Sequence, residues 1–244
     1  MKSGYLLFFD LDGTVLLGGR LPEEHRKALL KAKENGNFLI INSGRSRAYI
    51  PAAVLQDIPW DGMICGSVYV EWQSEVLHNH ILSDKTLKEV IDYVAKAKLR
   101  LVMEGVEKNY TYGMPDSSIA IDQDVEGFLA SSPNVSKVTF LDKPDPTQVP
   151  EFSGIRTIFF ATYAEGIAKG YTKKTGMEML LQKSGKDVSM TCAFGDSEND
   201  MEMLRFASLS AVMKHAPEIY DSFVQLRCES EFGVAEALEK LNFI

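Results

Sequence analysis

The sequence predicts an α/β fold in which a doubly wound parallel sheet is interrupted by a separate α+β module. Short, continuously apolar runs alternate with helical patterns at both ends of the chain, as in parallel sheets that helices cover on both faces. Between about residues 83 and 163 the pattern changes to hairpins and short helices, without long buried runs. We therefore predict a discontinuous core over residues 1–82 and 164–244, with the module inserted over residues 83–163.

The bulk composition is that of an ordinary globular protein, with 244 residues of which 45% are hydrophobic and 25% charged. The net charge of −8 argues against nucleic acid and membrane surfaces as partners, because both are polyanionic. The three cysteines lack the spacing of a metal site, which favours reduced thiols and a cytoplasmic location. The segment before Asp10 is too short for a signal peptide, and no apolar run reaches transmembrane length.

The first predicted strand is the apolar run Tyr5–Phe9, which leads directly into Asp10 and Asp12. Such a run suits a strand that is buried on both faces. Residues two apart in an extended chain point to the same side, so both carboxylates are expected to face one side at the carboxyl end of the strand. Two carboxylates held together favour a cation between them, although a plain acidic turn is the alternative interpretation.

A parallel βαβ unit is predicted next, from a helix over residues 23–35 and a second strand at Phe38–Ile41. The second strand is followed by Ser43, Gly44 and Arg45. Because the carboxyl ends of parallel strands meet at one edge of a sheet, we expect Ser43 and Gly44 beside the two aspartates. The alternative for this tripeptide is a helix-capping turn.

A third strand and a small hairpin complete the first half of the predicted core, at Gly62–Cys65 and at Val68–Val70 with Val76–His78. His78 and His80 alternate on the last of these strands. We interpret both as surface residues, because no further metal-type ligands accompany them.

The inserted module begins with a helix that Ser83 caps. A hairpin, a second short helix and two further strands follow, and none of them has the long buried pattern of the core. Their predicted ranges are Leu99–Met103, Asn109–Tyr112, Val125–Ala130, Val138–Leu141 and Ile155–Phe160.

The core pattern resumes with a helix over residues 166–183 and a strand that ends just before Asp196. Ser197 and Asp200 have the spacing of a capping box, which would explain Asp200 without any catalytic role. Capping does not explain Asp196, which is expected to share one helix face with Asn199 and Asp200. The last predicted elements are a strand at Leu209–Val212 and a helix at Val234–Leu241.

These strand ends resemble the four motifs of the haloacid dehalogenase (HAD) superfamily of phosphohydrolases. The matching segments are Asp10–Thr14, Ser43-Gly44, Lys169-Gly170 and Gly195–Asp200, in chain order. The place of the module resembles that of the mobile α/β cap in the Cof-like branch, which implies a Rossmann-like core beneath a cap domain. Two segments depart from the family pattern: Cys65-Gly66-Ser67 stands where Asn-Gly-Ala is usual, and Lys214-His215-Ala216 where Gly-Asn-Ala is frequent.

The resemblance implies a Mg²⁺-dependent phosphatase for a small phosphorylated metabolite, with a sugar phosphate as the expected substrate. Asp10 would be the nucleophile that forms an aspartyl-phosphate, and Asp12 the general acid and base. Mg²⁺ would be bound by Asp10, the backbone oxygen of Asp12 and Asp196. Asp200 would hold these metal-binding residues in position without binding the metal itself. The substrate would be held by Ser43, Gly44, Arg45, Lys169 and Asn199.

Two other functions remain open on the same residues. A phosphotransferase or phosphomutase would pass the phosphate to another sugar hydroxyl, but an acid and base at Asp12 favours hydrolysis. A non-catalytic sugar-phosphate sensor could dispense with the nucleophile, yet Asp10 is present. The oligomeric state is left open between a monomer and a weak dimer.

Overall fold

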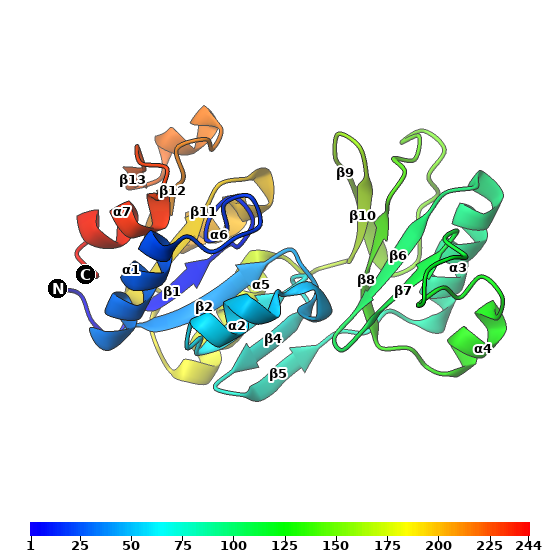
Figure 1. Cartoon of the computed structure of the whole chain (residues 1–244), viewed down its shortest axis with the longest axis horizontal. Helices are drawn as coiled ribbons and strands as arrows, with labels where there is room; N and C mark the ends of the chain where they lie inside the picture. The colour runs from blue at the N-terminus through cyan, green and yellow to red at the C-terminus, as the bar shows by residue number, and fades with distance from the viewer. The chain divides into compact units, whose positions relative to one another are not determined.

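The computed structural model describes residues 1–244, and the chain divides into two compact units (Figure 1). The first unit comprises residues 1–44, 50–78 and 172–244, and the second comprises residues 45–49 and 79–171. The second unit therefore begins four residues earlier and ends eight residues later than the predicted module. It also contains the short segment 45–49, which nothing in the sequence pattern indicated.

Eight strands form the sheet of the first unit, in the order β13-β12-β11-β1-β2-β3-β4-β5. All neighbours from β13 to β3 are parallel, and β4 turns back antiparallel to β3. This mixed but mainly parallel sheet confirms the predicted α/β class. The strands are β1 (Leu6–Phe9), β2 (Phe38–Ser43), β3 (Gly62–Cys65), β4 (Tyr69–Trp72), β5 (Glu75–Asn79), β11 (Thr191–Gly195), β12 (Leu209–Val212) and β13 (Leu226–Arg227).

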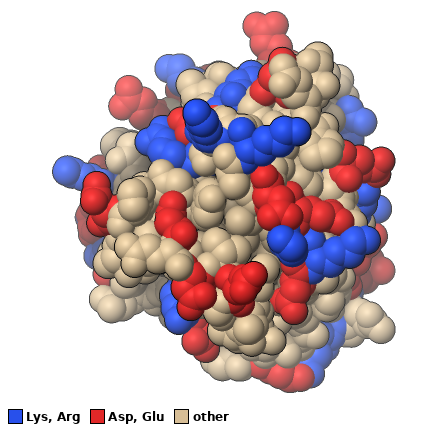
Figure 2. Space-filling view, turned by 90° about the vertical axis from the view of Figure 1, so that its right-hand side faces the viewer, with Lys and Arg blue, Asp and Glu red and all other residues tan.

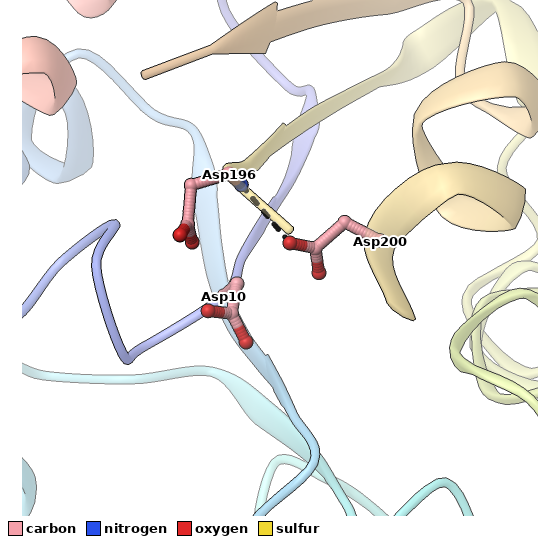
Figure 3. A group of neighbouring side chains, drawn as sticks. All are labelled: Asp10, Asp196 and Asp200. Atoms are coloured by element: carbon pink, nitrogen blue, oxygen red, sulfur yellow. Dashed lines mark hydrogen bonds between the residues drawn. The ribbon is translucent and has the colours of Figure 1, made fainter. Parts of the chain in front are cut away.

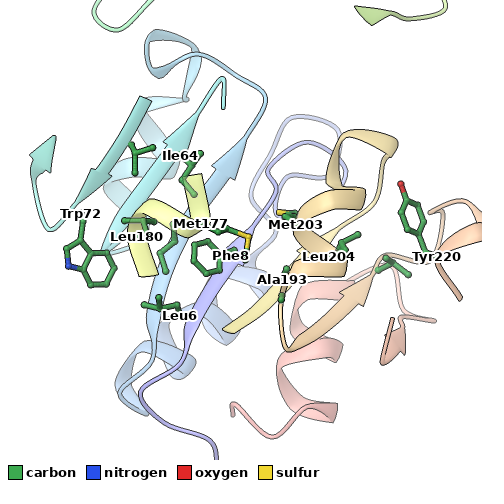
Figure 4. Close-up of a cluster of buried hydrophobic side chains, with 14 of the residues drawn as sticks. Leu6, Phe8, Ile64, Trp72, Met177, Leu180, Ala193, Met203, Leu204 and Tyr220 are labelled. Atoms are coloured by element: carbon green, nitrogen blue, oxygen red, sulfur yellow. The ribbon is translucent and has the colours of Figure 1, made fainter. Parts of the chain in front are cut away.

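Helices cover this sheet, and the central strand β1 is buried on both faces, as predicted. Leu6 and Phe8 belong to the cluster that α5 and α6 cover (Figure 4). The alternate residue Phe9 instead stacks on Phe194, with ring centroids 4.5 Å apart. None of the helices combines the length and apolar character needed to cross a bilayer. The helices of this unit are α1 (Glu23–Glu34), α2 (Ala52–Asp57), α5 (Lys173–Ser184), α6 (Met201–Phe206) and α7 (Gly233–Lys240).

The second unit is an antiparallel sheet in the order β7-β6-β8-β10-β9, together with two helices. Ser83 caps the longer helix, because its hydroxyl oxygen accepts the backbone N–H of Thr86 at 3.1 Å. The elements are α3 (Asp84–Ala97), β6 (Leu101–Gly105), β7 (Asn109–Tyr112), α4 (Val125–Ala130), β8 (Val135–Phe140), β9 (Ile155–Phe159) and β10 (Ala164–Ala168).

One face of this second sheet carries buried charges. Lys137 on β8 donates to Glu165 on β10 at 2.6 Å, and its Nζ lies 3.9 Å from Glu104 on β6. Thr139 donates to the same Glu104 at 2.5 Å. Lys137 and Glu104 are each 3% exposed, so this is a sequestered polar network rather than a solvated surface.

The predicted helix over residues 166–183 is wrong in its first part. Residues 164–168 form β10, which pairs with both β8 and β9. The helix α5 begins only at Lys173, because Thr172 caps it. The Thr172 hydroxyl oxygen accepts the N–H of Thr175, and the Thr175 hydroxyl oxygen accepts the N–H of Thr172. Gly170 precedes this cap with φ +86°, a conformation that favours glycine.

Candidate active site

Three carboxylates converge at the carboxyl ends of the neighbouring strands β1 and β11 (Figure 3). Asp10 follows β1 and Asp196 follows β11, while Asp200 lies on the 3₁₀ turn Glu198–Asp200 that leads into α6. One oxygen from each lies within 4.8 Å of the other two. Parallel pairing explains this proximity, because Phe9 lies opposite Phe194 in the sheet and each carboxylate follows just beyond.

A buried lysine joins two of these carboxylates. Lys173 is the first residue of α5, and its Nζ lies 2.5 Å from Oδ1 of Asp10 and 2.5 Å from Oδ1 of Asp200. Its side chain is only 2% exposed. The side-chain amide of Asn42 donates to the carbonyl of Lys173 at 3.1 Å, which ties the start of α5 to β2. The lysine is therefore fixed at both its backbone and its ammonium group.

The lysine that contacts Asp10 is Lys173, where the sequence predicted Lys169. Lys169 belongs to the second unit, where its ammonium donates to Glu151 at 2.7 Å and its side chain is 47% exposed. The difference follows from the helix boundary, since the helix starts at Lys173 instead of including Lys169. The available signal was Thr172, a good N-cap residue directly before a lysine.

The charges of the cluster perturb one another. Burial raises the pKa of Asp10 to about 7, and Asp200 and Asp196 act in the same direction against the opposing effect of Lys173. Burial disfavours the charged form of Lys173, but Asp10 and Asp200 outweigh it and raise the lysine's pKa. Lys173 thus stays protonated. Three carboxylates around one ammonium still leave an excess of negative charge, which a cation would balance.

Asp200 uses its oxygens within the protein. Its Oδ2 accepts the backbone N–H groups of Asp196 and Ser197, each at 3.0 Å, and its Oδ1 accepts Lys173. The capping box predicted from Ser197 and Asp200 is confirmed. Because the carboxylate is fully buried and engaged on both oxygens, its geometry suits holding Lys173 and the Asp196 backbone in place.

Asp196 is held from two sides. The hydroxyl of Thr14 donates to its Oδ1 at 2.9 Å, and Nε2 of His215 lies 3.1 Å from its Oδ2. Gly13 packs directly against it: a Cβ there would lie 2.5 Å from Oδ2, and the φ of Gly13 is +81°. Only glycine fits this turn, because the carboxylate occupies the space of a side chain. Sequence reasoning missed both Thr14 and His215 as partners of Asp196.

Asp12 does not share the environment of Asp10. Strand β1 ends at Phe9, so Asp12 lies on the following turn and its side chain is exposed, whereas Asp10 is 5% exposed. Because β1 ends at Phe9, strand alternation does not set the directions of Asp10 and Asp12, and their shared orientation stays a prediction.

The other predicted residues fall in two places. Ser43 is buried at the end of β2, and a Cβ on Gly44 would lie 3.4 Å from Nδ2 of Asn199. The second motif thus adjoins the fourth, as expected from the strand order. Arg45 belongs to the second unit and donates to the carbonyl of Tyr49 at 3.0 Å.

The sequence matches the family model of haloacid dehalogenase-like hydrolases over residues 7–154 and 151–238. The chain belongs to this family. This HAD-like hydrolase is 21% identical to "Putative phosphatase YkrA" of Bacillus subtilis (strain 168), with 98% of each chain covered. It is 22% identical to the 5-amino-6-(5-phospho-D-ribitylamino)uracil phosphatase YcsE of the same organism, with 96% of this chain and 94% of YcsE covered.

Solved structures agree with the fold. The HAD subclass IIB sugar phosphatase BT4131 superposes with a TM-score of 0.80 at 23% identity, over 98% of this chain and all of that one. The comparisons confirm the predicted family, the enzyme class and the core with an inserted cap. Asp10 and Asp196 offer carboxylate oxygens, whereas both oxygens of Asp200 are already engaged within the protein, and oxygen donors of this kind fit a hard divalent cation.

Proposed function

We propose that this HAD-like hydrolase is a Mg²⁺-dependent phosphatase that cleaves a small sugar or polyol phosphate through an aspartyl-phosphate on Asp10. The observation that carries the proposal is the pairing of Asp10 with Lys173. The ammonium engages Oδ1 of a buried carboxylate at the mouth of the sheet, which orients Oδ2 as the attacking atom.

In the first step, Oδ2 of Asp10 attacks phosphorus, and the bond from phosphorus to the substrate's alcohol oxygen breaks. Asp12, exposed on the turn after β1, gives its proton to the departing oxygen. In the second step, Asp12 takes a proton from water, which attacks phosphorus and releases inorganic phosphate and free Asp10. Splitting the reaction in two divides a barrier that is among the highest known for biological hydrolysis.

The remaining residues bind and orient. Lys173 takes the role that the sequence assigned to Lys169, because it is the lysine that touches Asp10. Ser43, Gly44 and Asn199 lie at adjoining strand ends and would hold phosphate oxygens. Asp10, the Asp12 backbone oxygen and Asp196 would hold Mg²⁺, which when bound neutralises the charge between the nucleophile and the phosphate.

The substrate class rests on three supports. YcsE acts by its name on a phosphorylated ribityl compound, and BT4131 is described as a sugar phosphatase. On the polar face of the second unit's sheet, the half-buried hydroxyl of Thr139 donates to Glu104, and its oxygen would accept a hydrogen bond from a substrate hydroxyl. On the face drawn in Figure 2, acidic and basic side chains are interspersed, without the continuous basic surface that binding of a polyanion would favour. We propose that the second unit is the cap that selects the alcohol.

A phosphate-release assay over a panel of phosphorylated sugars and polyols tests the function, with Asp10→Asn as the matched variant. The wild type should release phosphate from at least one polyol phosphate, and Asp10→Asn should lose activity by about 10³-fold or more. Adding a second sugar separates hydrolysis from transfer, since a transferase would make a new sugar phosphate instead. Binding without turnover in the wild type would indicate a sensor and refute the proposal.

A further inference from the structure

His215 contacts the candidate metal ligand Asp196 from outside the carboxylate cluster. Its Nε2 lies 3.1 Å from Oδ2 of Asp196. An ionised carboxylate can only accept hydrogen bonds, so Nε2 carries the hydrogen and donates it. His215 is not itself among the side chains whose ligand atoms converge, which are Asp10, Asp196 and Asp200. Its place is therefore behind a ligand rather than on the cation.

We propose that His215 is a positioning residue that orients Asp196 for the divalent cation, an inference that rests on the metal site of the proposed function. The two oxygens of Asp196 each receive one hydrogen bond, from Thr14 on one side and from His215 on the other. A carboxylate held at both oxygens cannot rotate about its terminal bond. Such outer partners set the orientation of metal-ligating groups and strengthen metal binding.

The loop that carries His215 is itself anchored, which an incidental surface contact would not require. The guanidinium of Arg227 on β13 donates to the carbonyls of Lys214 at 3.3 Å, Ala216 at 2.8 Å and Pro217 at 3.0 Å. Asp221 holds the same guanidinium at 2.6 Å. The carbonyls on both sides of His215 are thus fixed by one side chain.

The same loop is tied to the strand that presents Asp196. The backbone N–H of Met213 donates to the carbonyl of Gly195 at 3.1 Å, directly before Asp196 in the chain. The imidazole and its carboxylate therefore stand on one rigid frame. An isolated exposed ion pair is worth little, because both side chains must be ordered from free rotation. Here Asp196 is only 11% exposed and the backbone of both partners is already fixed.

Binding of Mn²⁺ to the substrate-free protein, followed by the loss of its free-ion EPR signal, tests this role apart from turnover. His215→Ala should weaken Mn²⁺ binding by about 10–100-fold. His215→Gln should stay within about 3-fold of the wild type, because its amide N–H reaches roughly as far as Nε2. His215→Asn, whose amide ends near the position of Nδ1, should behave like alanine. His78→Ala on β5, at the opposite edge of the sheet from β13, is the matched control and should bind as the wild type does.

The half-exposed position of His215, 56% by side chain, makes unfolding of these variants unexpected, and an unchanged melting temperature confirms it. At saturating Mg²⁺ the turnover of His215→Ala should recover, since a positioning residue shifts the metal requirement more than the chemical step. Equal Mn²⁺ affinity in all variants, or equal losses in Gln and Ala, would overturn the role of His215. Absence of Mn²⁺ binding in the wild type would instead overturn the metal site of the proposed function.

Discussion

Lys173 and Asp10 are separated by 163 positions in the chain, yet Nζ of Lys173 lies 2.5 Å from Oδ1 of Asp10. The lysine reaches the aspartate because the cap at Thr172 starts α5 at this point and Asn42 holds the backbone of Lys173 against β2. Asp200 accepts a second hydrogen bond from the same ammonium. The buried ammonium of Lys173 at the start of α5 therefore joins residues that follow β1 and β11, and its charge orients the nucleophile Asp10.

Replacing this lysine should abolish activity and destabilise the protein. Lys173→Met leaves two buried carboxylates without their cation, so we expect about 10³-fold lower kcat and about 3 kcal/mol less free energy of unfolding. Lys169→Met is the matched control, because it removes only an exposed pair with Glu151 and should leave the free energy of unfolding nearly unchanged. Kinetics and urea unfolding of both variants measure this. A larger kinetic loss in Lys169→Met would restore the original interpretation of the motif.

Removing divalent cations should remove activity. With all-oxygen ligands from Asp10 and Asp196, we expect excess chelator to stop phosphate release and Mg²⁺ to restore it, while Ca²⁺ fails because it prefers a larger and looser shell. Bound cation should also raise the free energy of unfolding, by about 2.7 kcal/mol at a concentration of 100 Kd. Asp196→Asn should require more Mg²⁺ for half-maximal activity. Full activity in excess chelator would contradict the metal role.

Most of the fold could be predicted because its signals are local. The apolar run before Asp10, the helix after Pro22 and the strand at Leu209–Val212 each show their periodicity and end signals within a few residues. The convergence of Asp10, Ser43 and Asp196 followed from strand order, since parallel neighbours end at one edge.

The sequence did not show which lysine contacts Asp10, nor where the second unit begins and ends. Residues 164–168 became a strand because β8 and β9 lie on either side of them, a tertiary effect that overrides local helix propensity. The helix α5 therefore starts later than predicted, and the lysine at its start, which contacts Asp10, is Lys173 instead of Lys169. Likewise, the contact of His215 with Asp196 depends on how a distant loop folds back, which no spacing rule shows.

The buried histidine of α1 should make stability depend on pH. Burial lowers the pKa of His25, although its Nδ1 donates to the carbonyl of Val15 at 2.9 Å. The unfolded chain therefore takes up the proton first as the pH falls. The free energy of unfolding therefore keeps its full value with respect to His25 above the ordinary pKa of about 6.5. Below that pH it falls, by up to about 1.4 kcal/mol per pH unit.

His25→Asn isolates this effect, because its amide lies near the position of Nδ1, keeps the donor to Val15 and cannot titrate. Urea unfolding of both proteins at pH 8, 7, 6 and 5.5 gives the difference in the free energy of unfolding at each pH. Every other titrating group is shared, so this difference should be constant above about pH 7 and move in favour of His25→Asn below about 6.5. A difference independent of pH would show that His25 does not resist protonation in the fold.

The second unit should select the alcohol part of the substrate while the first unit alone handles the phosphate. A deletion of residues 83–163 would remove β8 and β9 and leave β10 without the two strands that it pairs with. The link should therefore replace residues 79–171, the boundaries of the unit itself.

With a short Gly-Ser link at these boundaries, we expect kcat/KM for the best polyol phosphate to fall by about 100-fold or more, because its alcohol contacts are lost. Hydrolysis of acetyl phosphate, which has a small and activated leaving group, should fall by less than about 10-fold. A cooperative melting transition must first show that the shortened protein is folded. Equal losses for both substrates would mean that the second unit supports the structure instead of choosing the substrate, and no loss for either would mean that it does not act as a cap.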